Sequence, residues 1–244
     1  MVNLSQVWRA KCAKQPKDLL MSESLLLLAI DTCGPLGTVT LARLEGLDEL
    51  TILGQTELPG KTYSAQLTPA IRDLLSNDST RLDEIETIVV TNGPGSFTGI
   101  RIGLSTAKGL AEPTSIPILA VSRLVVLAHK AKTIAAALDA SRHELYFGDY
   151  SSCSAQETLI DSDRLQQLAN VLAGQLADAE ESLLTHAPQA TLVPPPTAAD
   201  ALRFALPRLR IRDYDDPTTL DGNYLRRSDA EIFSKPKLTP ISPA

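Results

Sequence analysis

The fold is most constrained by a pattern that occurs twice: an apolar run that ends in an aspartate and is followed by a second run. The first copy is 25–31 (LLLLAID), followed by an alternating run at 38–42. The second is 133–139 (TIAAALD), followed by 144–150. Continuous apolar runs are typical of strands buried on both faces of a sheet, and short turns between runs predict hairpins. The repetition predicts a duplicated α/β unit with a mixed sheet in each half.

The rest of the chain divides into helices and strands around these two pairs. Apolar residues at a spacing near 3.6 predict helices, and Pro113 is expected to end the second of them. Short apolar runs predict further strands. The expected helices are 64–75, 98–110, 122–130, 161–176 and 197–209, and the further strands are 50–58, 88–90, 118–121, 157–160 and 181–185.

The two ends of the chain differ from its middle. Residues 1–20 carry four basic side chains and one acid without an apolar segment of signal-peptide length, so Met21 is expected to be the functional start. The last residues mix lysine and proline, a composition typical of disorder. We therefore expect an N-terminal extension outside the core at 1–20, an N-terminal subdomain at 21–121, a C-terminal subdomain at 122–233 and a disordered tail at 234–244.

Composition excludes several classes of protein. Hydrophobic residues make up 43% of the chain, which is typical of globular domains, and no apolar run is long enough to span a bilayer. The net charge is -6 and aromatic residues make up only 4%, which argues against a stand-alone nucleic-acid-binding domain. Cys12, Cys33 and Cys153 form no zinc-binding pair and fit free thiols. Cys33 is expected to be a small buried side chain and not a nucleophile.

The stretch 91–111, TNGPGSFTGIRIGLSTAKGLA, combines the end of a strand, a glycine loop and a helix of small residues. This order occurs in phosphate-binding loops and also where a helix packs closely on a neighbour. The stretch has neither the lysine of a P-loop nor the glycine spacing of a dinucleotide-binding loop. Gly99, Gly103 and Ala107 form a row at i, i+4 and i+8, which favours close contact with another helix.

Three segments together resemble the bacterial TsaB family, proteins of tRNA threonylcarbamoyladenosine biosynthesis that were once grouped with glycoproteases. They are Ile30-Asp31-Thr32, the stretch 91–111 and 139–146 (DASRHELY), and 223–227 (NYLRR) resembles the closing motif of the family. The resemblance covers about 24–233. It implies an actin-like fold, of the sugar kinase and heat-shock ATPase type, with two subdomains and mixed sheets.

The resemblance also implies a role beside a partner. Family members bind the catalytic paralogue TsaD, which the ATPase TsaE joins, to form threonylcarbamoyladenosine next to the anticodon of tRNAs that read A-starting codons. TsaD carries a His-Leu-Glu-Gly-His metal motif where this chain has Arg123 and Leu127, neither of which ligates a divalent metal. We therefore expect a non-catalytic scaffold or activator in the cytoplasm, with no catalytic residue, metal or cofactor.

An interface between helices is implied as well. The helices at 64–75 and 98–110 are expected to form a bundle with the same pair from TsaD, or from a second copy when the chain is alone. tRNA is reached only through the complex, and no membrane is involved. Gly103→Arg is expected to prevent pairing and to leave the monomer folded. The family often has His-Ser where this chain has Tyr63-Ser64, which leaves the interface detail open. The expected interface residues are Tyr63, Leu67, Ile71, Leu74, Gly99, Ile102, Gly103, Thr106 and Leu110.

The alternative is a small-molecule kinase or nucleotide hydrolase of the same fold. Asp31 and Asp139 end equivalent strands, and a nucleotide cleft would place their carboxylates near Mg²⁺. Each acid would equally well accept backbone N–H bonds within its own turn. A peptidase has only the former grouping in its favour, because no nucleophile–base pair stands out. The three histidines, His129, His143 and His186, lie in different segments. The expected cleft residues are Asp31, Thr32, Gly34, Asp139 and Arg142.

Overall fold

A computed structural model describes residues 24–46, 49–152, 155–172 and 174–226 of the chain. The extension expected at 1–20, the start expected at Met21 and the tail expected at 234–244 lie outside these residues, as do Cys12 and Cys153. None of the helices within the described ranges is long and apolar enough to cross a bilayer.

The first sheet has five strands in the order β3-β2-β1-β4-β5. β1 pairs antiparallel with β2 and parallel with β4. β3 continues the antiparallel side and β5 the parallel side, so the apolar strand that ends in Asp31 is central. The strands are β1 (Leu25–Asp31), β2 (Leu36–Glu45), β3 (Glu49–Pro59), β4 (Thr87–Thr91) and β5 (Ile118–Val121).

The second sheet repeats the first, strand for strand. β6 is central, with β7 and β8 on its antiparallel side and β9 and β10 on its parallel side. The predicted fold class, an actin-like duplicated α/β fold with a mixed sheet in each half, is confirmed. The strands are β6 (Ala135–Asp139), β7 (Glu144–Asp149), β8 (Gln156–Asp161), β9 (Leu176–Asp178) and β10 (Thr191–Leu192).

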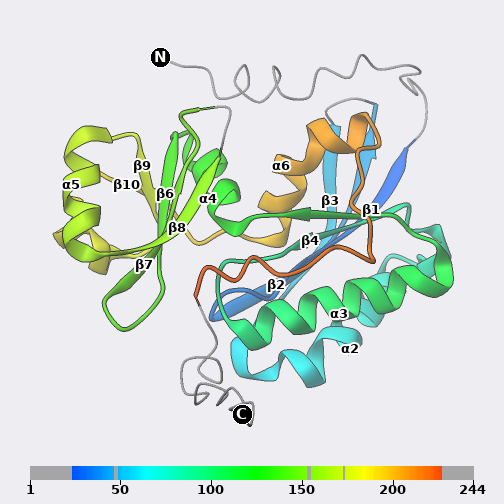
Figure 1. Ribbon diagram of the computed structural model, residues 1–244. Coiled ribbons are helices and arrows are strands. Elements are labelled where there is room, and N and C mark those ends of the chain that lie inside the picture. Colours follow the sequence, from blue (N-terminus) through cyan, green and yellow to red (C-terminus); the bar gives the residue numbers. More distant parts are fainter. Residues whose placement is uncertain (1–23, 47–48, 153–154, 173, 227–244) are drawn as a thin grey trace, which may run out of the picture.

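Helices cover both faces of each sheet, as Figure 1 shows. On the first sheet, α2 (Tyr63–Asn77) and α3 (Phe97–Thr114) pack on one face and α6 (Ala198–Arg210) packs on the other. On the second sheet, α4 (Arg123–Ala131) packs on one face and α5 (Ser162–Leu172) on the other. Each half is therefore a three-layer sandwich, with β1 and β6 as the buried centres.

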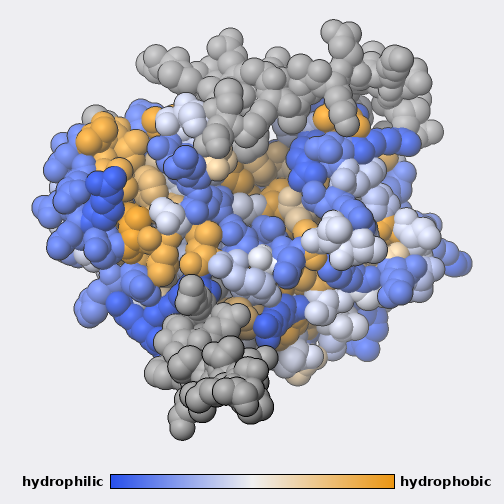
Figure 2. All heavy atoms as spheres, in the orientation of Figure 1, coloured by the Kyte–Doolittle hydropathy of each residue, from blue (hydrophilic) through white to orange (hydrophobic). Residues whose placement is uncertain are grey.

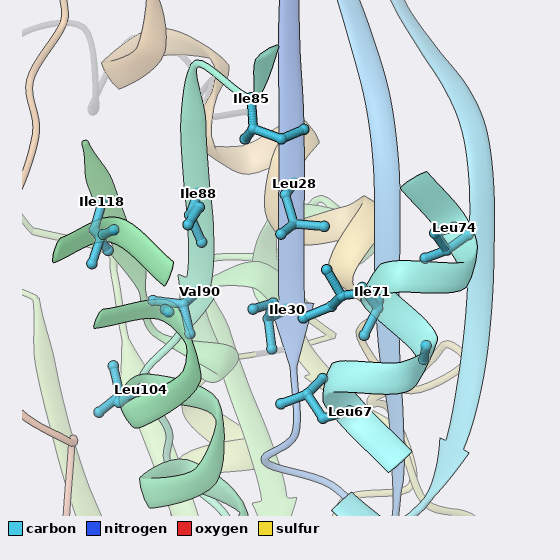
Figure 3. Close-up of a cluster of buried hydrophobic side chains, with 14 of the residues drawn as sticks. Leu28, Ile30, Leu67, Ile71, Leu74, Ile85, Ile88, Val90, Leu104 and Ile118 are labelled. Atoms are coloured by element: carbon cyan, nitrogen blue, oxygen red, sulfur yellow. The ribbon is translucent and has the colours of Figure 1, made fainter. Parts of the chain in front are cut away.

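Alternation along β1 decides which side chain meets which helix layer. Leu28 and Ile30 point toward α2 and α3, while Leu27 and Ala29 point toward α6. Figure 3 shows the first of these cores, in which Ile30 lies between side chains of α2, β4 and α3. Burying each large aliphatic side chain contributes roughly 1.5–3 kcal/mol, so this core anchors both helices to the sheet.

Two local predictions are wrong. The segment expected as a strand at 181–185 is a 3₁₀ helix, η3 (Glu181–Thr185), and the strand of this region is the three-residue β9, which is too short to stand out by periodicity. Pro113 does not end the second helix, because it lies inside the last turn of α3. The helix ends at Thr114, and Ser115 adopts a left-handed conformation after it.

The end of the described chain returns to the first half. α6 packs on the first sheet, and residues 213–226, here called the strap, follow β5 and then reach the second half. In Figure 1 the strap is the orange to red trace that crosses in front of the first sheet. The boundary at 121/122 remains a proposal, and the course of α6 shows that elements beyond 122 also build the core of the first half.

Candidate functional site

A cleft of about 880 Å³ lies where the two halves and the strap meet. Its walls come from the turn after β1, the loop before α3, the start of α4, the turn after β6 and the strap. This volume is in the range of small-molecule sites. Of the expected cleft residues, Gly34, Asp139 and Arg142 line the cleft, whereas Asp31 and Thr32 are buried and do not.

Both carboxylate oxygens of Asp31 contact groups of the same chain. Its side chain is 1% exposed. Its Oδ1 accepts the Cys33 N–H at 2.9 Å and the Thr91 hydroxyl at 2.7 Å. Its Oδ2 faces Nε of Arg123 at 3.4 Å. The carboxylate is thus neutralised and hydrogen-bonded within the fold, which is the turn-capping role and leaves it with no oxygen free for a metal.

Arg123, which the sequence marked only as a residue that does not ligate a metal, is the buried cation of the site. It begins α4, directly after the N-cap Ser122, and its backbone N–H donates to the Gly93 carbonyl. Its guanidinium lies against Gly34, where an added Cβ would collide with Nη2. Gly34 is therefore needed for close approach of the arginine and not for a bend. An arginine directly after an N-cap serine in an otherwise apolar helix was the available signal.

Asp139 occupies the same turn position in the second half but remains exposed. Its Oδ1 accepts the Ser141 N–H at 2.8 Å, the counterpart of the bond between Asp31 and Cys33. Glu180 also lines the cleft, and its pKa is raised by burial and by the charge of Asp139. Arg142 follows in a left-handed turn of the same wall. This wall therefore offers solvent-facing charges, while the Asp31 side offers a closed ion pair.

Cys33 is the buried side chain that was predicted. Its Sγ contacts the Thr91 hydroxyl at 3.2 Å, and the residue is 1% exposed. Burial, and then the charge of Asp31, raises the pKa of the thiol to about 12. A thiol with this pKa is neutral at physiological pH and is not a nucleophile.

The row of glycines on α3 faces its own chain, which corrects the expected interface. The hydroxyl of Thr32 donates to the Gly99 carbonyl at 2.7 Å. A Cβ on Gly99 would fall on the Thr32 carbonyl oxygen, and one on Gly103 would collide with the Thr32 hydroxyl. The small residues let α3 dock onto the turn after β1. Gly103→Arg would therefore disrupt the monomer, contrary to expectation.

The expected residues of α2 lie in the core as well. All four are buried between the helix and the first sheet, and Figure 3 shows three of them there. The Tyr63 hydroxyl donates to the Gly34 carbonyl at 2.7 Å, and burial raises its pKa to about 12. A partner helix cannot reach these side chains unless the core opens. The residues concerned are Tyr63, Leu67, Ile71 and Leu74.

Three of the expected interface residues do reach the surface. Ile102, Thr106 and Leu110 are half-buried on the outer side of α3, with the exposed Gly109 between the last two. A Cβ on Gly109 would meet nothing within 4 Å. In Figure 2 the surface over α2 and α3 is hydrophilic to intermediate, and the hydrophobic colour gathers on the other half. A helix docked here would rely on close approach over small residues.

The strap joins the two halves at the cleft. The Asn223 N–H donates to the Asn92 carbonyl of the first half at 2.6 Å, and Arg226 pairs with Glu144 of the second half at 3.2 Å. The ring of Tyr224 lies 4.6 Å from that of Phe97, measured between centroids. The sequence identified the motif that begins at Asn223 only through its family resemblance. Its neighbouring residues in the sequence do not show what it contacts.

Asp178 is a buried acid that the sequence did not reveal. It ends β9 and is fully buried; its Oδ1 accepts the Glu180 N–H at 2.8 Å, and its Oδ2 has no partner among the described residues. Burial, together with the smaller effect of the charges of Glu180 and Asp139, raises the pKa of Asp178 to about 7. A buried, half-satisfied carboxyl of this kind is protonated more readily than an exposed one.

Comparison with known proteins identifies the family. The family described as "TsaD: tRNA N6-adenosine threonylcarbamoyltransferase" matches residues 56–205. The tRNA threonylcarbamoyladenosine biosynthesis protein TsaB of Haemophilus influenzae is 29% identical over 167 residues, which is 66% of this chain and 67% of that protein. The TsaB proteins of Escherichia coli and Bacillus subtilis are 33% and 36% identical, over 51% and 52% of this chain. The matches span only 54% and 55% of those two relatives.

Solved structures agree with these matches. YeaZ from Pseudomonas aeruginosa has a TM-score of 0.64 at 25% identity, over 81% of this chain and 99% of that chain. A second structure from that organism, of a protein similar to peptidase YeaZ, has a TM-score of 0.66 at 25% identity, over 83% of this chain and 100% of that one. This chain belongs to the tRNA N6-adenosine threonylcarbamoyltransferase family and, within it, to the TsaB proteins.

Proposed function

We propose that this chain is a non-catalytic scaffold or activator subunit in the formation of threonylcarbamoyladenosine on tRNA. It pairs with a TsaD-like catalytic subunit, which a TsaE-like ATPase joins, and with a second copy of itself when alone. tRNA meets it only within that complex, in the cytoplasm. The named function of the TsaB relatives supports the pathway.

The ion pair between Arg123 and Asp31 is the observation that carries the non-catalytic role. At the position of the first metal histidine of TsaD, this chain has an arginine whose charge is committed to Asp31. At the position of the second, Leu127 is fully buried in the core of the second half. Guanidinium and alkyl groups do not ligate divalent metals, so the chain lacks the two imidazoles on which that metal site depends.

The outer side of α3 is the surface that supports pairing. Ile102 and Leu110 are half-buried and pack on the core from outside, which gives a partner helix fixed apolar contacts. Thr106 and Gly109 lie between them and leave room for close approach. This replaces the larger expected interface by a strip along one helix.

Gly109→Arg tests the interface without touching the core. The new side chain would point into open space, so the monomer is expected to stay folded, while its bulk and charge would block a docked helix. Association with the purified TsaD-like subunit would be measured by size-exclusion chromatography and calorimetry. Arg72→Gln, on the exposed side of α2, is the matched control because, among the described residues, its guanidinium pairs only with its neighbour Asp73.

Two results would count against the proposal in different ways. Full binding by Gly109→Arg would place the interface elsewhere. A reconstituted threonylcarbamoylation assay that runs at the same rate without this chain would contradict the activator role itself. We expect the rate to fall strongly when the chain is left out, and to fall with Gly109→Arg in proportion to lost binding.

The kinase or hydrolase alternative has less support. It requires a carboxylate at the end of β1 to hold Mg²⁺, and Asp31 is buried against Arg123. On the opposite wall Asp139 remains accessible, with Glu180 beside it. The assay for this alternative is ATP turnover by the isolated chain, which we expect to be absent.

A further inference from the structure

We propose that the strap, through Arg226, holds the turn between β6 and β7 in a strained left-handed conformation, and that this turn relaxes when Arg226 is detached from it. Because most of the turn lines the cleft, the strap then decides the shape of one cleft wall. This inference goes beyond the scaffold role and does not depend on it.

The turn contains three consecutive residues with a positive φ, and none of them is a glycine. Ser141, Arg142 and His143 have φ values of 63°, 58° and 63°. The Glu144 N–H donates to the Ser141 carbonyl at 3.2 Å, so Arg142 and His143 are the central residues of a hairpin turn that favours glycine and asparagine. A residue with a Cβ is disfavoured at each of these positions. The surrounding structure therefore has to hold the turn in this conformation.

The length of the turn does not impose the left-handed conformation. Residues 140–143 connect β6 to β7, and the equally long 32–35 connects β1 to β2. All of 32–35 is described, and none of these residues has a positive φ. The N–H bond that Asp139 accepts within its turn also has a counterpart at Asp31, so it does not account for the difference. The difference points to a contact that is specific to the second half.

Arg226 makes such a contact at the base of the turn. Its Nη1 donates to the Ala140 carbonyl, and its Nη2 pairs with a carboxylate oxygen of Glu144 at 3.2 Å. These two residues flank the three left-handed ones, and the Ala140 N–H donates to the Glu144 carbonyl at 3.0 Å. A planar guanidinium that binds both ends of a turn fixes their separation and orientation. Arg226 thus braces the turn against relaxation.

The strap has anchors of its own on the first half, which keep Arg226 in place. The Lys108 ammonium of α3 donates to the Leu220 carbonyl at 2.6 Å. The Asn223 N–H donates to the Asn92 carbonyl at 2.6 Å. Because these bonds do not involve the turn, the turn can relax while the strap stays bound. Loss of the two Arg226 contacts is therefore expected to shift the φ values of the turn into the negative region.

A double-mutant cycle with the full chain tests the proposal. Glycine adopts a positive φ without a steric penalty, so His143→Gly is expected to raise the folded-to-unfolded ratio about two- to fivefold. In the Arg226→Gln background this stabilisation is expected to disappear, because position 143 of the relaxed turn no longer has a positive φ. Urea denaturation of the unchanged chain, the two single variants and the double variant measures the effect.

Lys132→Gly is the matched control. Lys132 has a φ of 59° at the end of α4, where its N–H donates to the His129 carbonyl at 3.2 Å. Its left-handed conformation belongs to the helix cap and not to the strap. Lys132→Gly is therefore expected to raise the folded-to-unfolded ratio by a similar factor with and without Arg226→Gln.

A second variant covers the case in which Arg226→Gln does not fold. Glu144→Gln removes the charge that pairs with Arg226 and is expected to reduce the stabilisation by His143→Gly. NMR chemical shifts and three-bond couplings of 141–143 report φ directly in each folded variant. The proposal is overturned if His143→Gly does not stabilise the unchanged chain, if it stabilises Arg226→Gln equally, or if all three φ values stay positive in Arg226→Gln. Where Arg226→Gln does not fold, equal stabilisation of Glu144→Gln overturns it instead.

Discussion

The two halves repeat the same unit, yet their central turns have diverged in opposite directions. Asp31 and Asp139 each end the middle strand of a sheet, and each accepts the backbone N–H two residues on. Asp31 is then sealed by Thr91 and Arg123, whereas Asp139 stays exposed in the cleft. The same turn is thus buried and hydrogen-bonded within the protein in the first half, and exposed to the cleft in the second.

The neighbouring strands explain this difference. β4 ends beside Asp31 with Thr91, whose hydroxyl donates to the acid. When the pairing of β6 with β9 is continued, Asp139 falls opposite Glu180, a like charge. Like charges on adjacent strands repel and favour solvent exposure, while a donor favours burial. The residue on the adjacent strand therefore favours closure of the first turn and exposure of the second.

The halves also differ in the element that packs on this turn. The first half has the 18-residue α3 between its two parallel outer strands, and the second has only the five-residue η3. The glycines of α3 allow it to dock on Thr32, and this docking covers the first turn.

The largest contrast is expected between Asp31→Ala and Asp139→Ala. The first leaves the charge of Arg123 buried without its partner, which costs about 3–5 kcal/mol of unfolding free energy. The second removes one exposed turn contact and should change the free energy by about 0.5 kcal/mol or less. Urea denaturation followed by circular dichroism measures both. Equal decreases in the free energy of unfolding for the two variants would show that the two turns are equivalent.

The second largest effect on the free energy of unfolding is expected when a glycine of α3 is replaced by alanine. Gly99→Ala forces the helix away from the Thr32 carbonyl and should cost about 3 kcal/mol. Gly109→Ala, on the exposed side of the same helix, should raise the free energy of unfolding by about 0.5–1 kcal/mol. If thermal unfolding shows both variants to be stabilised, the close docking of α3 is wrong.

A smaller, pH-dependent effect is expected from Asp178 in the second half. Because its folded pKa is raised to about 7, the folded chain holds this proton where the unfolded chain has released it. The free energy of unfolding therefore falls as pH rises from about 4 to about 7, because the stabilisation that comes from protonated Asp178 is lost. Asp178→Asn should flatten the dependence over this range and raise the free energy of unfolding at pH 8. An unchanged pH profile in urea denaturation would contradict the raised pKa.

The last contrast affects reactivity and not stability. Cys33 and Ser141 occupy equivalent turn positions, one buried with a thiol pKa of about 12 and the other exposed. In Ser141→Cys, the introduced thiol should react with an alkylating reagent at pH 8 at least about 100-fold faster than Cys33. Mass spectrometry of the labelled peptides measures both rates in one molecule. Comparable rates would contradict the burial of Cys33.

The sequence predicted the fold well because its strongest signals are local. The apolar runs that end in Asp31 and Asp139 identified both central strands, and periodic apolar residues placed every long helix within a few residues of its bounds. β9 escaped detection because three residues carry no period, and 181–185 resembled a strand because its apolar residues lie together. Hydrophobic periodicity therefore predicts a helix or strand only when the element is long enough to show a period.

The site was harder to predict because it depends on pairings across the fold. Gly99 and Gly103 were predicted to contact a partner helix, and the sequence does not show that they lie against Thr32 of the same chain. Asp31 and Asp139 look alike in sequence and differ only through Thr91, Arg123 and Glu180. The partners that decide what Asp31 can do lie 60 and 92 residues away from it along the chain.

Amide exchange in the strap can report on the width of the cleft. Its hydrogen bond to Asn92 and its ion pair with Glu144 hold the two halves at one separation, so a wider cleft requires at least one of these contacts to break. By linkage, any molecule that prefers the cleft at its present width must slow amide exchange at Asn223 and Tyr224, and one that wedges it apart must accelerate that exchange. Amide exchange in the strap therefore reports on what the cleft contains.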